Sequence, residues 1–341
     1  IFEKNSEELM SPSSMSKIMT IYFVFKKLND GELKLTDKFK VSKKAWKKGG
    51  SKMFLNVNTM VSLEDLIRGI IVQSGNDACI AIAEAISGSE KLFAEELNIL
   101  AKEIGLTDSN FTNSTGWPDP DHLTTIKDLL TLTIRTIEDF PSLYHYYSEK
   151  EFTYGGIKQL NRNPLLFNSE GADGLKTGHT SLGGYGLVAS IKKNNRRLIL
   201  ILNGLKKTKD RTKESERLIR IGLNQYKNIN LFKENQTVTN IKVWGGKKKN
   251  VNVYTKEKIN VTVPNKIKKN LMYSIKHYKP LVAPLEKDQK VAELIIKKKN
   301  NEIIKKFELF SRNEVKKMSF LAKVYYNLKY LLLGDSIFIS E

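Results

Sequence analysis

The chain has 341 residues, of which 40% are hydrophobic and 28% are charged, and its formal net charge is +20. This length and composition allow two folded domains and exclude a disordered chain. The single cysteine, Cys79, excludes an intramolecular disulfide and a cysteine-based metal site, and we expect it to be a small buried apolar residue.

The chain begins at Ile1 without Met and without an apolar leader segment. We therefore expect a mature or trimmed chain from which any signal peptide is missing. No apolar run is long enough to predict a membrane-spanning helix.

Helical patterns dominate the first part of the chain. An apolar face recurs along Met15–Leu28, and Pro12 suits the start of that helix. Ser62 can cap the next helix. Further helices are predicted over Leu63–Gln73, Asp77–Ile86, Ser89–Ile104, Thr124–Thr136 and Asp210–Tyr226.

Two apolar runs, Tyr185–Ile191 and Arg196–Gly204, are separated by a polar turn. This pattern predicts neighbouring antiparallel strands. After residue 228 the chain alternates β-prone runs with polar turns, which predicts a small all-β domain. The runs are Thr237–Val243, Val251–Tyr254, Ile259–Val263 and Val291–Ile296.

The positive charge is concentrated in this last third. From residue 229 onward 24 Lys and Arg stand against 10 Asp and Glu, which gives +14 of the total +20. Such a surface attracts anionic partners. A lysine-rich genome would give a similar bias, and no motif typical of nucleic-acid binding is present, so we expect no nucleic acid as partner.

Residues 313–333 carry apolar side chains at helical spacing, with lysines at other positions. This pattern predicts a basic amphipathic helix that lies on an anionic membrane surface; the alternative is a helix packed on the β domain. The apolar residues are Met318, Leu321, Ala322, Tyr325, Leu328 and Leu332, and the lysines are Lys316, Lys317, Lys323 and Lys329.

A serine three residues before a lysine, Ser14 and Lys17, is the first candidate for chemistry. A serine hydroxyl needs an adjacent base, and a lysine is a base only when neutral, which burial and a nearby cation such as Lys176 would favour. The Ser-x-x-Lys motif alone is weak evidence for a catalytic site, because a lysine-rich chain often contains it by chance. Its occurrence before Ser74-Gly75-Asn76 and Lys176-Thr177-Gly178, in this order, is very specific.

The chain resembles the low-molecular-mass penicillin-binding proteins, specifically the two-domain, membrane-anchored D-alanyl-D-alanine carboxypeptidases. The resemblance covers essentially the whole chain and is strongest over residues 3–225. It rests on Pro12–Thr20, Ser51–Phe54, Val72–Ala78, Asn161–Asn163 with Leu165–Leu166, Asp173–Thr180 and Leu281–Leu285.

The resemblance implies an α/β (α+β) penicillin-binding, β-lactamase-like transpeptidase domain, with an antiparallel sheet flanked by helices and a helical cluster. A small all-β domain and a C-terminal amphipathic helix follow. We expect the boundaries at 1–228 for the catalytic domain, 229–311 for the β-rich domain and 312–341 for the membrane-association helix and tail.

The resemblance also implies residue roles. Ser14 would attack the carbonyl between the two D-alanines of a peptidoglycan stem peptide, and Lys17 would take its proton. Ser74 would relay the proton to the leaving amine, and Asn76 would position Lys17 and the substrate.

On the other side of the site, Lys176 and Thr177, on an edge strand with Gly178, would hold the terminal carboxylate. The backbone N–H groups of Ser14 and His179 would form the oxyanion hole. Arg162 and Arg211 match family arginines near or behind the cleft, where a structural ion pair is at least as plausible as substrate contact.

The same resemblance implies that β-lactam antibiotics acylate Ser14 and that the enzyme acts at the periplasmic face of the bacterial inner membrane. The histidines lack ligand spacing, so no metal or other cofactor is expected. A class A β-lactamase would be shorter and carry Ser-Asp-Asn. A D,D-endopeptidase and a catalytically weak murein-binding scaffold stay open as alternatives.

Overall fold

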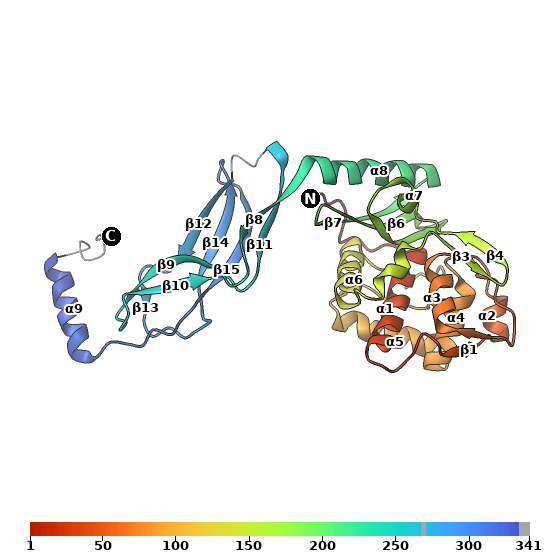
Figure 1. The fold of residues 1–341 in the computed structure, drawn as a ribbon, viewed down its shortest axis with the longest axis horizontal. Coiled ribbons are helices and arrows are strands. Elements are labelled where there is room, and N and C mark those ends of the chain that lie inside the picture. Colours follow the sequence, from red (N-terminus) through yellow and green to blue (C-terminus); the bar gives the residue numbers. More distant parts are fainter. Residues whose placement is uncertain (267–270, 334–341) are drawn as a thin grey trace. The chain divides into compact units, whose positions relative to one another are not determined.

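A three-stranded antiparallel sheet and a cluster of helices form the first of two units in the computed structural model, Phe2–Leu223 (Figure 1). The structure describes residues 1–266 and 271–333. The helices of this unit are η1 (Ser13–Ser16), α1 (Lys17–Asn29), α2 (Lys43–Lys47), α3 (Leu63–Ile71), α4 (Asn76–Ser87), α5 (Glu90–Glu103), α6 (Ile126–Asp139), η2 (Tyr144–Ser148), α7 (Leu165–Asn168) and α8 (Thr208–Gln225, which ends just beyond it).

The sheet has the strand order β5-β6-β7, so that β5 is an edge strand. Its strands are β5 (Ala172–Thr180), β6 (Gly184–Lys193) and β7 (Arg196–Leu205). Two small two-stranded sheets lie outside it: β1–β2 (Lys38–Lys40, Met60–Ser62), whose strands are joined by a segment that contains α2, and the hairpin β3–β4 (Glu151–Tyr154, Ile157–Leu160). The predicted antiparallel pair is confirmed as β6 and β7. Asn194 and Asn195 turn the chain between them at φ values of 51° and 58°, a left-handed conformation that asparagine tolerates.

Side chains alternate between the two faces of this sheet. On one face Val188 and Leu175 belong to the large core that also contains α1. On the other face Leu187 and Ala189 pack with Ile219 of α8. The sheet is therefore buried on both faces.

Helix α1 lies at the centre of the large core, and its residues from Lys17 to Phe25 are all buried. A helix that is apolar nearly all round is stable only inside a core. It begins at Lys17, two residues later than predicted, because Ser13–Ser16 form a 3-10 turn instead. Three of the other predicted helices begin at side-chain caps, where Ser62, Ser89 and Thr125 each accept a backbone N–H three residues on.

The second unit, from Asn224 onward, contains a six-stranded sheet in the order β12-β14-β15-β10-β9-β13 and a two-stranded ribbon, β8–β11. The predicted all-β character is confirmed. Four of its strands, β8, β12, β13 and β15, were not predicted from the sequence. The strands are β8 (Tyr226–Phe232), β9 (Thr237–Trp244), β10 (Asn250–Tyr254), β11 (Ile259–Pro264), β12 (Leu271–His277), β13 (Leu281–Val282), β14 (Lys290–Lys298) and β15 (Ile303–Ser311).

The last helix, α9, runs over Phe320–Leu333 and thus begins seven residues later than the predicted span of 313–333. The preceding segment is extended, because Val315 exchanges two backbone hydrogen bonds with Leu285. Lys316 and Lys317 are therefore not on the helix. The side chain of Lys329 and residues 334–341 lie outside what the structure describes. Among the described residues, no helix combines the length and apolar character needed to cross a membrane.

Candidate active site

The Ser14 hydroxyl and the Lys17 side chain meet where the 3-10 turn η1 passes into α1. The Nζ atom of Lys17 donates a hydrogen bond to Ser14 Oγ over 2.9 Å and another to the carbonyl oxygen of Thr115 over 2.6 Å. In a 3-10 turn, residues i and i+3 lie almost directly above one another, which brings these two side chains together.

Lys17 is fully buried. Burial lowers the pKa of its ammonium to about 8, and the charges of Arg162 and Lys48 contribute in the same direction. A lysine with this pKa is neutral in roughly a tenth of molecules at pH 7, which makes it available as a base.

The loop between α3 and α4 brings Ser74 and Asn76 to the same region. Ser74 is buried at a φ of 60°, and its hydroxyl has no hydrogen-bond partner in the described part of the chain. The Asn76 side chain donates to the carbonyl oxygen of Gly49 over 2.8 Å, and its backbone N–H donates to Ser51 O over 2.7 Å. The loop around Gly49–Ser51 is thereby fixed beside α4.

Asp77 is a structural residue whose role the sequence did not predict. Its buried carboxylate accepts the backbone N–H of Met53 over 3.0 Å and that of Leu55 over 3.1 Å. Charge-assisted hydrogen bonds of this kind are strong. The sequence feature that could have pointed to this role is that Asp77 is an acidic residue in the first turn of a helix.

The edge strand β5 forms another wall of the site. Lys176 and Thr177 are buried, and Gly178 lies so close to η1 that a Cβ there would come within 2.3 Å of Ser13 Oγ. His179 is exposed and stacks on Tyr185, with ring centroids 3.9 Å apart. Gly178 thus allows the strand to pass directly beside the turn that carries Ser14.

The pKa of Lys176 lies well below its usual value, first because the ammonium is buried and then because of the charge of Lys17. We expected burial and a nearby cation such as Lys176 to lower the pKa of Lys17. Burial is indeed the main cause. Lys17 and Lys176 also interact, because the charge of Lys17 lowers the pKa of Lys176, and repulsion between two ammoniums is mutual.

A loop around Thr115 completes the surroundings of Lys17 and was not predicted. The Asn113 side-chain oxygen accepts hydrogen bonds from the Thr115 N–H over 3.1 Å, the Thr115 hydroxyl over 3.0 Å and the Trp117 N–H over 2.9 Å. A Cβ on Gly116, at φ +73°, would come within 1.9 Å of Ser13 O. The asparagine and glycine shape the loop that holds Lys17.

Ser16, two residues after Ser14, is also buried, and its hydroxyl is hydrogen-bonded to His122. Thr112 N–H donates to His122 Nδ1 over 3.1 Å, so Nδ1 carries no proton and Nε2–H donates to Ser16 Oγ over 2.7 Å. Burial lowers the pKa of His122 to about 4, which keeps the ring neutral. This pair is structural.

The two arginines lie near the site in different environments. Arg162 is exposed and donates to Ser51 Oγ over 2.6 Å. Arg211 is buried, lies over the Tyr185 ring and donates to the carbonyl oxygen of Arg162 over 3.4 Å. Within residues 1–266 and 271–333, neither arginine forms an ion pair.

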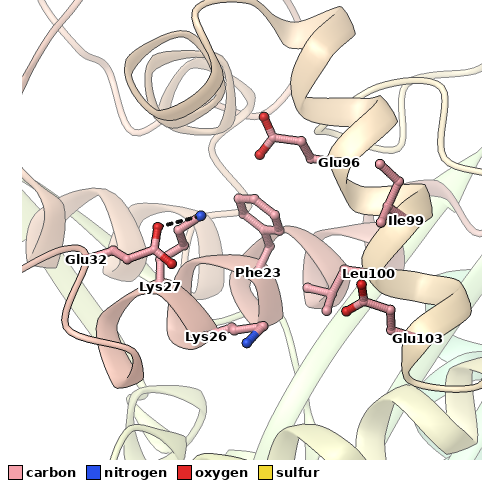
Figure 2. A pocket seen from close by; sticks show the side chains of 8 residues that line it. All are labelled: Phe23, Lys26, Lys27, Glu32, Glu96, Ile99, Leu100 and Glu103. Atoms are coloured by element: carbon pink, nitrogen blue, oxygen red, sulfur yellow. Dashed lines mark hydrogen bonds and ion pairs between the residues drawn. The ribbon is translucent and has the colours of Figure 1, made fainter.

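A separate cavity of about 170 Å³ lies between α1 and α5 (Figure 2). Its α1 residues, Phe23, Lys26 and Lys27, are six to ten positions beyond Lys17, about 9–15 Å along the helix. Lys27 is paired with Glu32 over 2.6 Å. This cavity is distinct from the Ser14 site. No group of three or more metal-ligating side chains is found in the described ranges.

Comparison with known proteins identifies the family. The family model described as D-alanyl-D-alanine carboxypeptidase matches residues 1–206, and the model of the penicillin-binding protein 5 C-terminal domain matches residues 226–317. The carboxypeptidase DacC of Escherichia coli is 38% identical over 331 residues, which cover 95% of this chain and 82% of DacC.

Similarity to solved structures supports the same family. Penicillin-binding protein 5 of Haemophilus influenzae superimposes with a TM-score of 0.87 at 35% identity, covering 93% of this chain and 94% of that one. Penicillin-binding protein D2 of Listeria monocytogenes, in its ampicillin-bound form, gives 0.60 at 26% identity over 65% of this chain and 91% of that one. The resemblance and the fold class inferred from the sequence are confirmed: the chain belongs to the D-alanyl-D-alanine carboxypeptidase family of penicillin-binding proteins and is a serine-type D-alanyl-D-alanine carboxypeptidase.

Proposed function

We propose that Ser14 is the nucleophile of this carboxypeptidase and Lys17 its general base. The observation that carries the proposal is the 2.9 Å contact between Lys17 Nζ and Ser14 Oγ, made by a buried lysine whose pKa is lowered to about 8. The neutral amine takes the hydroxyl proton as the oxygen attacks the carbonyl carbon of the substrate's last peptide bond.

Ser74 and Asn76 act in the second half of this step. When the C–N bond breaks, the leaving amine of D-alanine needs a proton. The buried hydroxyl of Ser74, which has no hydrogen-bond partner among the described residues, can pass that proton from Lys17. Asn76, held by Gly49 O, orients the substrate amide. The acyl group remains on Ser14 as an ester, which water then hydrolyses.

The β5 edge binds the substrate. Lys176 and Thr177 hold the terminal carboxylate, and a carboxylate beside Lys176 would restore the charge that burial disfavours. Gly178 lets the strand approach η1, so that the N–H groups of Ser14 and His179 can serve as the oxyanion hole. Arg162 and Arg211 provide positive potential around that carboxylate.

The substrate is the stem peptide of peptidoglycan, and β-lactams act as covalent inhibitors because they present a reactive carbonyl to the same serine. The similarity to a relative solved with ampicillin bound supports this assignment. We place the enzyme outside the cytoplasm, at the outer face of the inner membrane, with a catalytic domain at 1–228, a β-rich domain at 229–311 and a membrane-association segment at 312–341.

Attachment to an anionic membrane is assigned to α9. Leu321, Tyr325, Leu328 and Leu332 recur at helical spacing and are all exposed, between 54% and 82%. Lys323 is exposed on the same helix and can place its ammonium among headgroups. Leu328→Glu should abolish binding to vesicles of anionic phospholipid, and Asn327→Glu, with the same charge change at an exposed polar position, should bind like the wild type.

Intact-mass analysis after incubation with penicillin tests the nucleophile. One adduct should form on the wild type and on Ser16→Ala, and none on Ser14→Ala. Persistence of the adduct in Ser14→Ala would contradict the assignment. Release of D-alanine from a pentapeptide, measured beside cleavage of a cross-linked dimer, separates the carboxypeptidase from an endopeptidase and from a weak binding protein.

A further inference from the structure

Three segments of the second unit line a cavity of about 690 Å³ that is open to solvent on one side. They are residues 247–248 after β9, residues 284–287 after β13 and residues 313–316 between β15 and α9. The volume lies in the range of small-molecule sites. The cavity is far along the chain from the residues of the active site, all of which lie before Tyr226.

Backbone hydrogen bonds fix these walls. Leu285 and Val315 exchange bonds of 3.0 and 2.8 Å, and Lys247 N–H donates to Lys316 O over 2.8 Å. Val315 and Leu285 are buried, and a Cβ on Gly246 would come within 2.6 Å of Val315. The cavity is therefore part of the folded domain.

Positive charge dominates the lining. The lining contains four lysines and two acidic residues: Lys247, Lys248, Lys287 and Lys316, with Glu286 and Glu314. Glu314 is paired with Lys316 over 3.3 Å. In the stretches of chain that the structure describes, Lys247, Lys248 and Lys287 form no ion pair. Four lysines against two carboxylates leave the lining with a formal charge of +2.

We propose that this lysine-lined cavity binds the phosphate of an anionic phospholipid headgroup. Three unpaired ammoniums can share one phosphodiester through charge-assisted hydrogen bonds. The apolar side chains of Pro284, Leu285 and Val315 suit the glycerol carbons beside it.

The position of the cavity in the chain points to lipid as the source of the phosphate. Lys316 is four residues before Phe320, the first residue of α9, a separation of at most about 14 Å. If α9 lies in the membrane interface with its apolar face against the acyl chains, the short connection to Lys316 keeps the cavity at the level of the lipid headgroups. The inference rests on the proposed membrane attachment of α9 and adds a specific headgroup site to it.

The test measures partition of the full chain into vesicles by co-sedimentation. Vesicles contain either phosphatidylglycerol with phosphatidylcholine or phosphatidylcholine alone, at about 150 mM salt to limit long-range attraction. The variant K247A/K248A/K287A should bind the anionic vesicles about ten-fold more weakly than the wild type.

A charge-matched control separates a site from general attraction. K233A/K258A/K276A removes three exposed lysines of the same unit outside the cavity and should lose less than about three-fold. Equal losses in the two variants would overturn the proposal. Both should keep the wild-type unfolding temperature and D-alanine release, because all six lysines are exposed and lie outside the active site.

A soluble headgroup separates the two sources of phosphate. Glycerophosphoglycerol should bind the wild type in calorimetry and not the cavity variant. Binding of inorganic phosphate alone, with vesicle partition unchanged in the variant, would assign the cavity to free phosphate and overturn the lipid assignment. Wild-type protein that binds no vesicles but still binds the headgroup would contradict the attachment by α9 and not the cavity.

Discussion

The side-chain nitrogen of Lys17 lies 2.6 Å from the carbonyl oxygen of Thr115, a residue 98 positions further along the chain. This contact holds the lysine in place without neutralising it, because a carbonyl oxygen carries no net charge. A carboxylate at the same point would raise the pKa of the lysine and remove the base. The loop that carries Thr115 is thus part of the catalytic apparatus, although it supplies only backbone atoms.

Asn113 positions this loop, so Asn113→Ala should slow acylation without removing the nucleophile. The substitution deletes the acceptor of two backbone N–H groups and one hydroxyl and should cost about 1–3 kcal/mol of stability. We expect the rate of penicillin acylation to fall by roughly 10- to 100-fold, because a loosened Thr115 lets Lys17 move away from Ser14. Stopped-flow acylation kinetics measure the effect.

The control for this variant is Asn110→Ala, which removes one hydrogen bond, of 2.7 Å, to Asp121 O in the same part of the chain. It should acylate at the wild-type rate. An unchanged rate in Asn113→Ala, with the stability loss present, would show that the loop does not position the base.

The acylation rate should follow the protonation of Lys17. Since the base acts when neutral and its pKa is about 8, the rate should rise about ten-fold per pH unit below 8 and level off above it. Lys48 contributes to the low pKa, so Lys48→Ala should move the inflection to higher pH. Lys47→Ala removes a neighbouring exposed charge that has no such effect and should leave the profile in place. A rate independent of pH between 6 and 8 would contradict the assignment of Lys17 as base.

His122 should make the protein less stable in acid. Its pKa in the folded state is about 4, below the ordinary value of 6.5, because the ring is buried. The unfolded chain therefore binds a proton that the folded one does not, and stability falls as the pH drops from 6.5 towards 4, by about 3 kcal/mol at most.

Urea unfolding across this pH window tests the effect. His122→Gln removes the titrating group, so its free energy of unfolding should depend less steeply on pH than that of the wild type, even though the variant is less stable overall. The same slope in both proteins would assign the acid sensitivity to other groups.

The sequence was sufficient where function depends on local spacing. Ser14 and Lys17 are three residues apart and meet in either an α-helix or a 3-10 turn, so the pair was predictable even though the helix start was not. The β6–β7 hairpin was predictable because two apolar runs flank the polar turn at Asn194–Asn195.

Contacts between distant segments were not predictable. The hydrogen bond that Lys17 donates to Thr115, and those that Asp77 accepts from Met53 and Leu55, depend on how helices and loops pack, which no local pattern encodes. Strand β15 was missed because Lys305 and Lys306 interrupt its apolar alternation. The helix expected from residue 313 begins later because backbone pairing with Leu285 extends the intervening segment.

A substitution at Gly178 tests how closely strand β5 must approach η1, the turn that carries Ser14. In Gly178→Ala the new Cβ would lie 2.3 Å from Ser13 Oγ and 2.9 Å from Pro12 O, so strand and turn must separate. We expect acylation to fall at least ten-fold and the unfolding temperature to drop.

Ser13→Gly in the same chain removes the nearest clashing atom and suits the φ of 49° at that position. The double variant should therefore recover part of the acylation rate, although the contact with Pro12 O remains. The recovery appears as a coupling term in a double-mutant cycle, because the new methyl group clashes with the side chain that the second substitution removes. Additive losses would show that the β5 edge tolerates the methyl group and that Gly178 is required for some other reason.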